Sequence, residues 1–89
     1  MADYYNEAIN ALKLAGMSKS TQESYVRSVR QLVDFYDKEP DLITEKELQG
    51  YFLHRKDEDQ WAAATLRISQ CGIRFFFQKV LKREWHIFM

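Results

Sequence analysis

Residues 62–82, with the sequence AAATLRISQCGIRFFFQKVLK, are predicted to form the longest helix of the chain and to decide its fold. One apolar stripe recurs at helical spacing and consists of Leu66, Ile73, Phe77 and Val80. A second apolar strip, on roughly the opposite side, consists of Ile68, Gly72 and Phe75. A helix that is apolar on two sides is either central to a bundle or carries an interface for a partner. The stretch therefore predicts an all-α protein built around this segment.

The segments before residue 62 predict three further helices, at about residues 3–15, 19–37 and 45–56. Gly16 lies where a left-handed cap would end the first of them, because glycine tolerates a positive φ. Ser18 is the expected N-cap of the second helix. Thr44, with Glu47 three residues later, forms a capping box at the start of the third.

The apolar sides of these helices are expected to pack together. The predicted core consists of Tyr25, Val29, Leu32, Leu48, Phe52, Leu66, Ile73 and Phe77. The opposite side of the second helix is typical of an exposed face and carries Glu23, Arg27, Arg30 and Asp34. With 46% hydrophobic residues in 89, the chain is predicted to form one domain, residues 1–89, folded as a four-helix bundle.

The composition argues against several classes of protein. No run approaches the ~18 apolar residues that a transmembrane helix needs, and the first residues do not resemble a secretory signal. A single cysteine rules out an internal disulfide and suits a reducing cytoplasm. One cysteine and two histidines do not supply a structural zinc site, and the sequence has no phosphate-binding glycine loop or nucleophile motif. We therefore expect a cytoplasmic domain with no catalytic residue, no metal and no cofactor.

Charge is unevenly distributed along the chain although the net charge is zero. Residues 38–60 contain four Lys/Arg against seven Asp/Glu, whereas residues 61–89 contain five Lys/Arg against one Glu. A neutral chain with a basic segment can still bind an anion on one face.

One flank of the last helix is the leading candidate for such binding. At helical spacing it carries Arg67, Arg74, Gln78 and Lys82. This row suits contacts to phosphates and to a base edge in the major groove of DNA. An ordinary solvated face has the same pattern, so the pattern alone leaves both interpretations open.

The start of the second helix is another candidate. It carries Lys19, Ser20 and Thr21, next to the free amides of a helix N-terminus. Hydroxyls, amides and a lysine together form a natural phosphate site. The same residues are also what a simple N-cap requires.

Four stretches resemble the core-binding domain at the N-terminus of tyrosine recombinases, the phage-type and integron-type integrases. They are residues 16–25 (GMSKSTQESY), 29–36 (VRQLVDFY), 41–48 (DLITEKEL) and 64–81 (ATLRISQCGIRFFFQKVL). Their order and spacing match that family over about residues 5–86. Two segments depart from it, since residues 57–60 are acidic and residues 61–64 (WAAA) replace a Ser-Pro-Ser type of helix entry.

The resemblance implies a four-helix SAM-like orthogonal bundle that forms half of a clamp around DNA. The second and fourth helices face DNA in that family, which adds Arg27, Arg30 and Thr65 to the expected DNA-binding residues. Catalytic residues belong to a following C-terminal domain, so this chain is not expected to be an enzyme and the interdomain linker would begin near Met89. The expected partners are double-stranded DNA, that catalytic domain and other protomers of a synaptic complex.

A helical protein–protein interaction module is the alternative interpretation. In it, Ile68 and Phe75 of the second apolar strip would dock a partner helix. The two interpretations differ in one observable, which is whether the chain binds duplex DNA with an affinity that falls steeply with salt.

Overall fold

In the computed structural model of the chain, which describes residues 4–85, the backbone forms four α-helices and, within those residues, no β-strand. The helices are α1 (Tyr4–Leu14), α2 (Lys19–Tyr36), α3 (Glu45–Asp57) and α4 (Ala63–Phe75). A 3₁₀ turn, η1 (Pro40–Leu42), lies between α2 and α3, and a π-helical segment, η2 (Phe76–Val80), continues α4. The predicted all-α, four-helix class is confirmed. Asp3, near the expected start of the first helix, lies outside the described residues.

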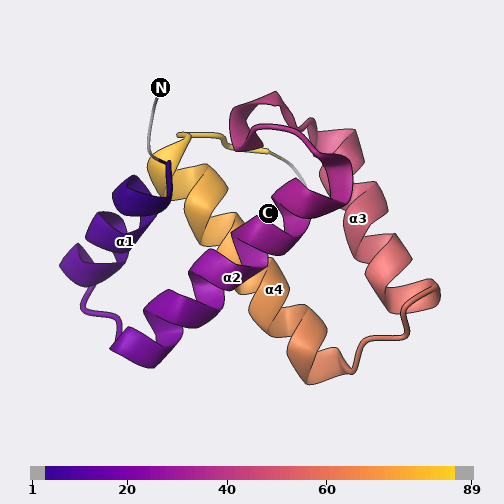
Figure 1. Cartoon of the computed structure of the whole chain (residues 1–89), viewed down its shortest axis with the longest axis horizontal. Coiled ribbons are helices and arrows are strands. Elements are labelled where there is room, and N and C mark those ends of the chain that lie inside the picture. Colours follow the sequence, from indigo (N-terminus) through magenta and orange to yellow (C-terminus); the bar gives the residue numbers. More distant parts are fainter. Residues whose placement is uncertain (1–3, 86–89) are drawn as a thin grey trace.

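The helices α2 and α4 cross at the centre of the molecule, with α1 on one side and α3 on the other (Figure 1). Of the two interpretations of a helix with two apolar sides, the structure supports a central position for α4. No helix among the described residues combines the length and the apolar character needed to cross a membrane.

The turn between α1 and α2 is formed by residues suited to ending one helix and starting another. Gly16 has a φ of 76°, and the Met17 N–H donates to the Leu12 carbonyl at 3.0 Å. This left-handed glycine with a six-to-one hydrogen bond is a Schellman motif. The Ser18 hydroxyl then accepts the Thr21 N–H at 3.2 Å. The predicted caps at Gly16 and Ser18 are both confirmed.

The capping box at the start of α3 is also confirmed. The Thr44 hydroxyl accepts the Glu47 N–H at 3.1 Å, and the Glu47 carboxylate accepts the Thr44 N–H at 3.0 Å. Lys38 donates to the other Glu47 oxygen at 2.7 Å. The hydrogen bond from Lys38, followed by that from the Thr44 amide, lowers the pKa of Glu47 below its usual value. Ile43 and Leu48, on either side of the box, are both buried in the core.

The core is formed where the apolar sides of the helices meet. Its buried members are Ala8, Val29, Leu32, Ile43, Leu48, Tyr51, Ile73, Phe76 and Phe77. Five of the eight predicted core residues are therefore buried: Val29, Leu32, Leu48, Ile73 and Phe77.

The prediction was wrong for Tyr25, Phe52 and Leu66, which are only half-buried. Tyr25 packs at the edge of the bundle against Phe75, with ring centroids 6.1 Å apart. Phe52 packs on the core from outside, and Leu66 lies in the first turn of α4. Tyr51, on the same apolar side of α3 as Leu48, and Phe76 are buried in addition.

The predicted single helix over residues 62–82 changes character after Phe75. The next five residues adopt the wider π-helical turn, and the Leu81 N–H donates to the Phe76 carbonyl at 3.2 Å. A wider turn rotates successive side chains by less than the 100° of an α-helix. Phe76 and Phe77, although adjacent in sequence, are both almost completely buried.

The crossing of α2 over α4 depends on Gly72. A Cβ atom at this position would lie 3.0 Å from the Cα of Tyr25 and 3.3 Å from the Cβ of Ser28. The first distance is shorter than ordinary van der Waals contact, and it involves a backbone atom that cannot rotate away. The absence of a side chain therefore lets the two helix backbones approach each other.

Truncating Phe77 tests the packing of the core. Phe77 is fully buried, so Phe77→Ala is expected to lower the free energy of unfolding by about 3–5 kcal/mol. Leu14→Ala is the control, because Leu14 is 90% exposed and its truncation should change stability by less than about 0.5 kcal/mol. Chemical denaturation measures both, and a loss below about 1 kcal/mol for Phe77→Ala would contradict the packing.

Removing the Thr44 hydroxyl tests the capping box. Thr44→Ala leaves the Glu47 amide without its acceptor, and we expect a loss of about 1 kcal/mol in urea denaturation. Thr44→Ser retains the hydroxyl and should lose much less. Equal stability of Thr44→Ala and wild type would show that the box adds nothing to α3.

Two glycine substitutions test the crossing as a matched pair. Gly72→Ala should destabilise the fold by about 1–3 kcal/mol, because its Cβ meets the backbone of α2. Gly50→Ala should instead stabilise it by up to about 1 kcal/mol, because Ala is the better helix former. A Cβ at Gly50 would be 3.6 Å from the Tyr36 hydroxyl, an ordinary contact. Thermal denaturation reports both, and the crossing is wrongly described if Gly72→Ala is as stable as Gly50→Ala.

Candidate functional site

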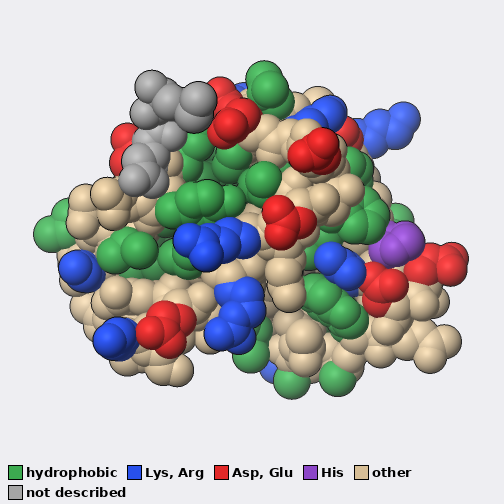
Figure 2. Space-filling view, viewed as in Figure 1, with side chains coloured by type: hydrophobic (Ala, Val, Ile, Leu, Met, Phe, Trp, Pro, Cys, Tyr) green, Lys and Arg blue, Asp and Glu red, His purple; other side chains and the backbone are tan. Residues whose placement is uncertain are grey.

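The exposed face of α2 carries most of its charge. The exposed residues are Glu23, Arg27, Arg30 and Asp34, as the sequence predicted, together with Lys19. Lys and Arg side chains gather over the middle of α2 in the space-filling view (Figure 2). The opposite side of the helix packs on α1 and α4, so this charged face is the part of α2 that a ligand could reach.

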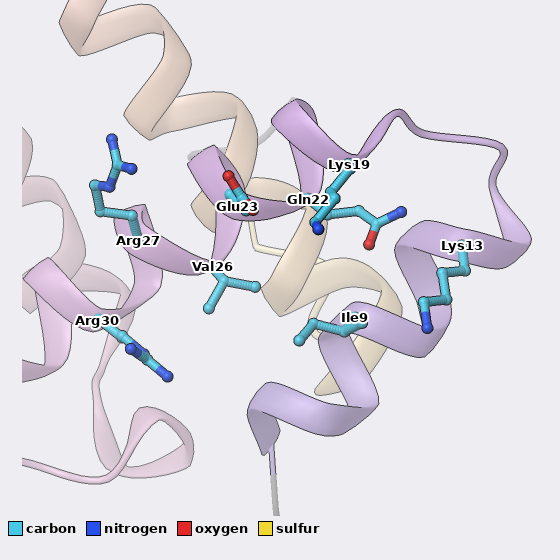
Figure 3. Close-up of a pocket in the computed structure, with 8 residues that line it drawn as sticks. All are labelled: Ile9, Lys13, Lys19, Gln22, Glu23, Val26, Arg27 and Arg30. Atoms are coloured by element: carbon cyan, nitrogen blue, oxygen red, sulfur yellow. The ribbon is translucent and has the colours of Figure 1, made fainter.

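A groove of about 730 Å³ runs between α1 and the charged face of α2 (Figure 3). Its lining residues are Ile9, Lys13, Lys19, Gln22, Glu23, Val26, Arg27 and Arg30. Three predicted DNA-binding residues, Lys19, Arg27 and Arg30, thus meet at one groove. The sequence analysis missed Lys13, which α1 contributes. Its helical spacing from Ile9 was visible, but nothing in the sequence indicated that this flank faces α2.

Some of the polar groups at the start of α2 are already hydrogen-bonded within the fold. The Ser18 hydroxyl accepts the Thr21 amide and donates to the Thr21 hydroxyl at 3.1 Å. Lys19 and Ser20 remain exposed beside it. Of the three predicted residues at this turn, Lys19 and Ser20 are therefore better placed than Thr21 to contact a ligand.

A second, smaller groove of about 210 Å³ lies at the crossing of α2 and α4. It is lined by Ser24, Arg27, Ser28, Gln31, Trp61, Thr65, Ile68 and Ser69. The crossing brings the predicted residues Arg27 and Thr65 together from the two helices. Gln31, one turn after Arg27, was missed in the sequence because its neighbours on α4 could not be known. The buried hydroxyl of Ser69 has no hydrogen-bond partner in this polar groove.

The basic row of α4 faces another direction. Gly72 contacts α2, and at 100° per residue Arg67 and Arg74 lie about 140° and 160° around α4 from it. Both are exposed. Arg74 and the half-buried Gln78 line a third groove, of about 420 Å³, with Met17 and Tyr25 among its other residues. The structure thus does not join this row to the charged face of α2.

The predicted row also ends earlier than expected. Its fourth member, Lys82, follows the π-helical segment and has a φ of 57°, so it is no longer in a helix. The four-residue spacing to Lys82 therefore does not correspond to a shared face.

The second apolar strip of α4 is interrupted. Gly72 is buried against α2, and Phe75 is half-buried against Tyr25. Ile68 is 50% exposed. The surface available to a partner helix under the alternative interpretation is thus reduced mainly to Ile68.

An aromatic cluster around Arg55, which the sequence analysis did not predict as a unit, holds the turn before α4. The guanidinium lies 5.4, 5.0 and 4.7 Å from the ring centroids of Phe35, Tyr51 and Trp61. It also pairs with Asp59 at 2.7 Å, at the four-residue spacing that could have suggested the pair. Trp61 lines the crossing groove, so Arg55 helps to position one wall of it.

The chemistry of these surfaces suits binding. Guanidinium, ammonium, amide and hydroxyl groups donate hydrogen bonds to phosphate oxygens and to base edges. Among the described residues, no group of His, Cys, Asp and Glu is arranged to hold a metal ion.

Comparison with known proteins gives consistent relationships. Residues 4–87 match the family described as phage integrase, N-terminal SAM-like domain. A protein of Sinorhizobium fredii named as an integrase/recombinase is 30% identical over 74 residues, covering 83% of this chain and 24% of that protein. Tyrosine recombinase XerA of Saccharolobus solfataricus is 41% identical over 49 residues, covering 55% of this chain and 17% of the relative. The chain therefore spans less than a quarter of either relative. No solved structure matches the chain significantly.

Proposed function

The chain belongs to the family of phage-integrase N-terminal SAM-like domains, and on this premise we propose that it binds duplex DNA at a recombination site. Membership confirms the predicted resemblance and the SAM-like fold, and it makes the chain an N-terminal domain of the tyrosine recombinase/integrase type. The observation that carries the DNA proposal is the exposed cationic face of α2 with the grooves beside it.

Unpaired cations on that face support the proposal. Among the described residues, Lys38 forms an ion pair with Glu47, and Arg55 forms one with Asp59. Within this part of the chain, no ion pair involves Lys19, Arg27 or Arg30. Free cations of this kind release counterions from DNA when they contact phosphates. The proposed DNA-binding residues are Lys19, Ser20, Thr21, Arg27, Arg30, Thr65, Arg67, Arg74 and Gln78.

The groove at the crossing of α2 and α4 is suited to contacts with base edges rather than with phosphates. Arg27 and Gln31 side chains can form paired hydrogen bonds to the edges of guanine and adenine, respectively. Thr65 adds a hydroxyl and a methyl group from α4. We assign contacts to base edges to Gln31 and Thr65 of this groove, and phosphate contacts to the exposed cations, Arg27 included.

The domain is proposed to act as one DNA-binding unit over residues 1–89 and to clamp DNA without catalysing its cleavage. The length of its relatives supports the proposal that a C-terminal catalytic domain of the same protein performs the reaction. Other protomers of a synaptic complex are proposed as further partners. The protein-interaction alternative retains one supporting observation, the exposed Ile68.

Two charge reversals test the proposal and determine which surface faces DNA. Lys19→Glu/Arg27→Glu changes the face of α2, and Arg67→Glu/Arg74→Glu changes the far flank of α4. Each pair that contacts two phosphates should lose at least about 60-fold in affinity at ~0.1 M salt, because each contact contributes about 0.9 to the slope of log affinity against log salt. Fluorescence anisotropy with a labelled duplex of about 20 base pairs, two helical turns, measures this loss.

Lys46→Glu/Lys56→Glu on α3 is the control, since it makes the same change in net charge at two exposed residues. It should bind within a few-fold of wild type, and circular dichroism should show that all variants remain folded. A wild-type protein that fails to bind at about 50 mM salt would contradict the DNA proposal. An equal loss of affinity in the control and in the two test pairs would also contradict the DNA proposal.

A further inference from the structure

We propose that the groove between α1 and α2 holds one phosphodiester strand of the DNA, with Lys13 of α1 as a phosphate contact. The inference rests on the proposed function and adds to it a helix, α1, that neither the family resemblance nor the sequence patterns placed at the DNA. It also assigns a specific task to this groove, distinct from that of the groove where α2 crosses α4.

Charge is the first argument for a phosphate backbone. The groove is lined by four cationic side chains, Lys13, Lys19, Arg27 and Arg30, and by one carboxylate, that of Glu23. Within the part of the chain that the structure describes, none of these cations forms an ion pair. The groove therefore carries an excess of positive charge that the fold does not neutralise, and charge complementarity favours a polyanion.

The arrangement of the cations selects an extended anion over a small one. Lys19 and Arg30 are separated by eleven residues of one helix, or about 16 Å along its axis. A phosphodiester strand lying along the groove would place more than one successive phosphate within that length. A single phosphate ion would meet one of these cations at a time, whereas a strand lying along the groove meets several.

The two sides of the groove are formed by different helices. Figure 3 shows Ile9 and Val26 facing each other across it, with Lys13 towards one end and Arg30 towards the other. Arg30 is held there by α1, because its guanidinium lies 4.9 Å from the centre of the Tyr5 ring. The apolar side chains between the cations hold the helices together, and the charged ends of the longer side chains reach the solvent.

Lys13→Gln is the decisive variant. Lys13 is exposed and has no partner among the described residues, so the substitution removes a charge without disturbing the fold. It should lower the slope of log affinity against log salt by about 0.9 and weaken binding roughly eightfold at ~0.1 M salt. Lys46→Gln on α3, the same change at an exposed lysine away from the groove, should leave both quantities unchanged.

Lys13→Gln/Arg30→Gln extends the test to both ends of the groove. The slope should fall by about 1.8 and the affinity by about 60-fold at ~0.1 M salt. The single variant remains interpretable even if the loss of the Tyr5 contact weakens the fold of the double variant. All titrations use the whole 89-residue chain, a labelled duplex of about 20 base pairs and salt between about 50 and 200 mM.

The outcomes separate this inference from the proposed function. If wild type binds DNA, and Lys19→Glu/Arg27→Glu or Arg67→Glu/Arg74→Glu abolishes binding while Lys13→Gln matches wild type, the groove inference is overturned and the DNA proposal stands. If wild type does not bind at low salt, the DNA proposal itself fails. Binding of a polyglutamate peptide provides a further test. If Lys13→Gln weakens binding of this peptide but not of DNA, the groove belongs to an acidic protein segment, and the inference is again overturned. A loss of affinity in both Lys13→Gln and Lys13→Gln/Arg30→Gln, with Lys46→Gln unchanged, supports a DNA strand in the groove.

Discussion

The close approach of α2 and α4 at Gly72 is the constraint on which the rest of the molecule depends. Because no side chain at Gly72 separates the two backbones, the helices cross closely at the centre of the molecule. The helices α1 and α3 then each fill one side of this crossing. Ile73 and Phe77, on the same helix as Gly72, are then directed into the core beside α2. The wider turn of η2 allows Phe76 to be buried as well, so that the end of the helix closes the bundle over α1.

This crossing also determines the directions in which the exposed surfaces point. Since α2 and α4 pack through Gly72 and its neighbours, the side of each helix opposite the contact points away from the other helix. The cations of α2 and the pair Arg67 and Arg74 of α4 are therefore divided between separate surfaces. The flanks that meet beside the crossing, through Arg27 and Thr65, bring cationic and hydroxyl groups of both helices to one surface.

Local signals allowed the helices and their ends to be predicted from the sequence. The caps at Gly16, Ser18 and Thr44 depend on residues within a few positions of one another, and all three are present in the structure. The burial of Val29 and Ile73 followed from the periodicity of their own helices. What could not be predicted depends on contacts between segments distant in sequence. Periodicity gives the side of α1 that carries Lys13 but not the helix that this side faces, and it gives no indication of the π-helical turn that separates Lys82 from the row.

The distribution of charge has a consequence for the approach of the domain to a partner. The acidic residues at the end of α3 and just after it, Asp57, Glu58 and Asp59, lie on one side of the crossing, whereas the cationic groove lies on the other side, beside α1. A neutral molecule with charges separated in this way has an electric dipole. In the field of a polyanion it experiences a torque that turns its positive end forward, with little net attraction at long range. Orientation would thus be selected before contact, and salt would weaken this selection as the Debye length shortens.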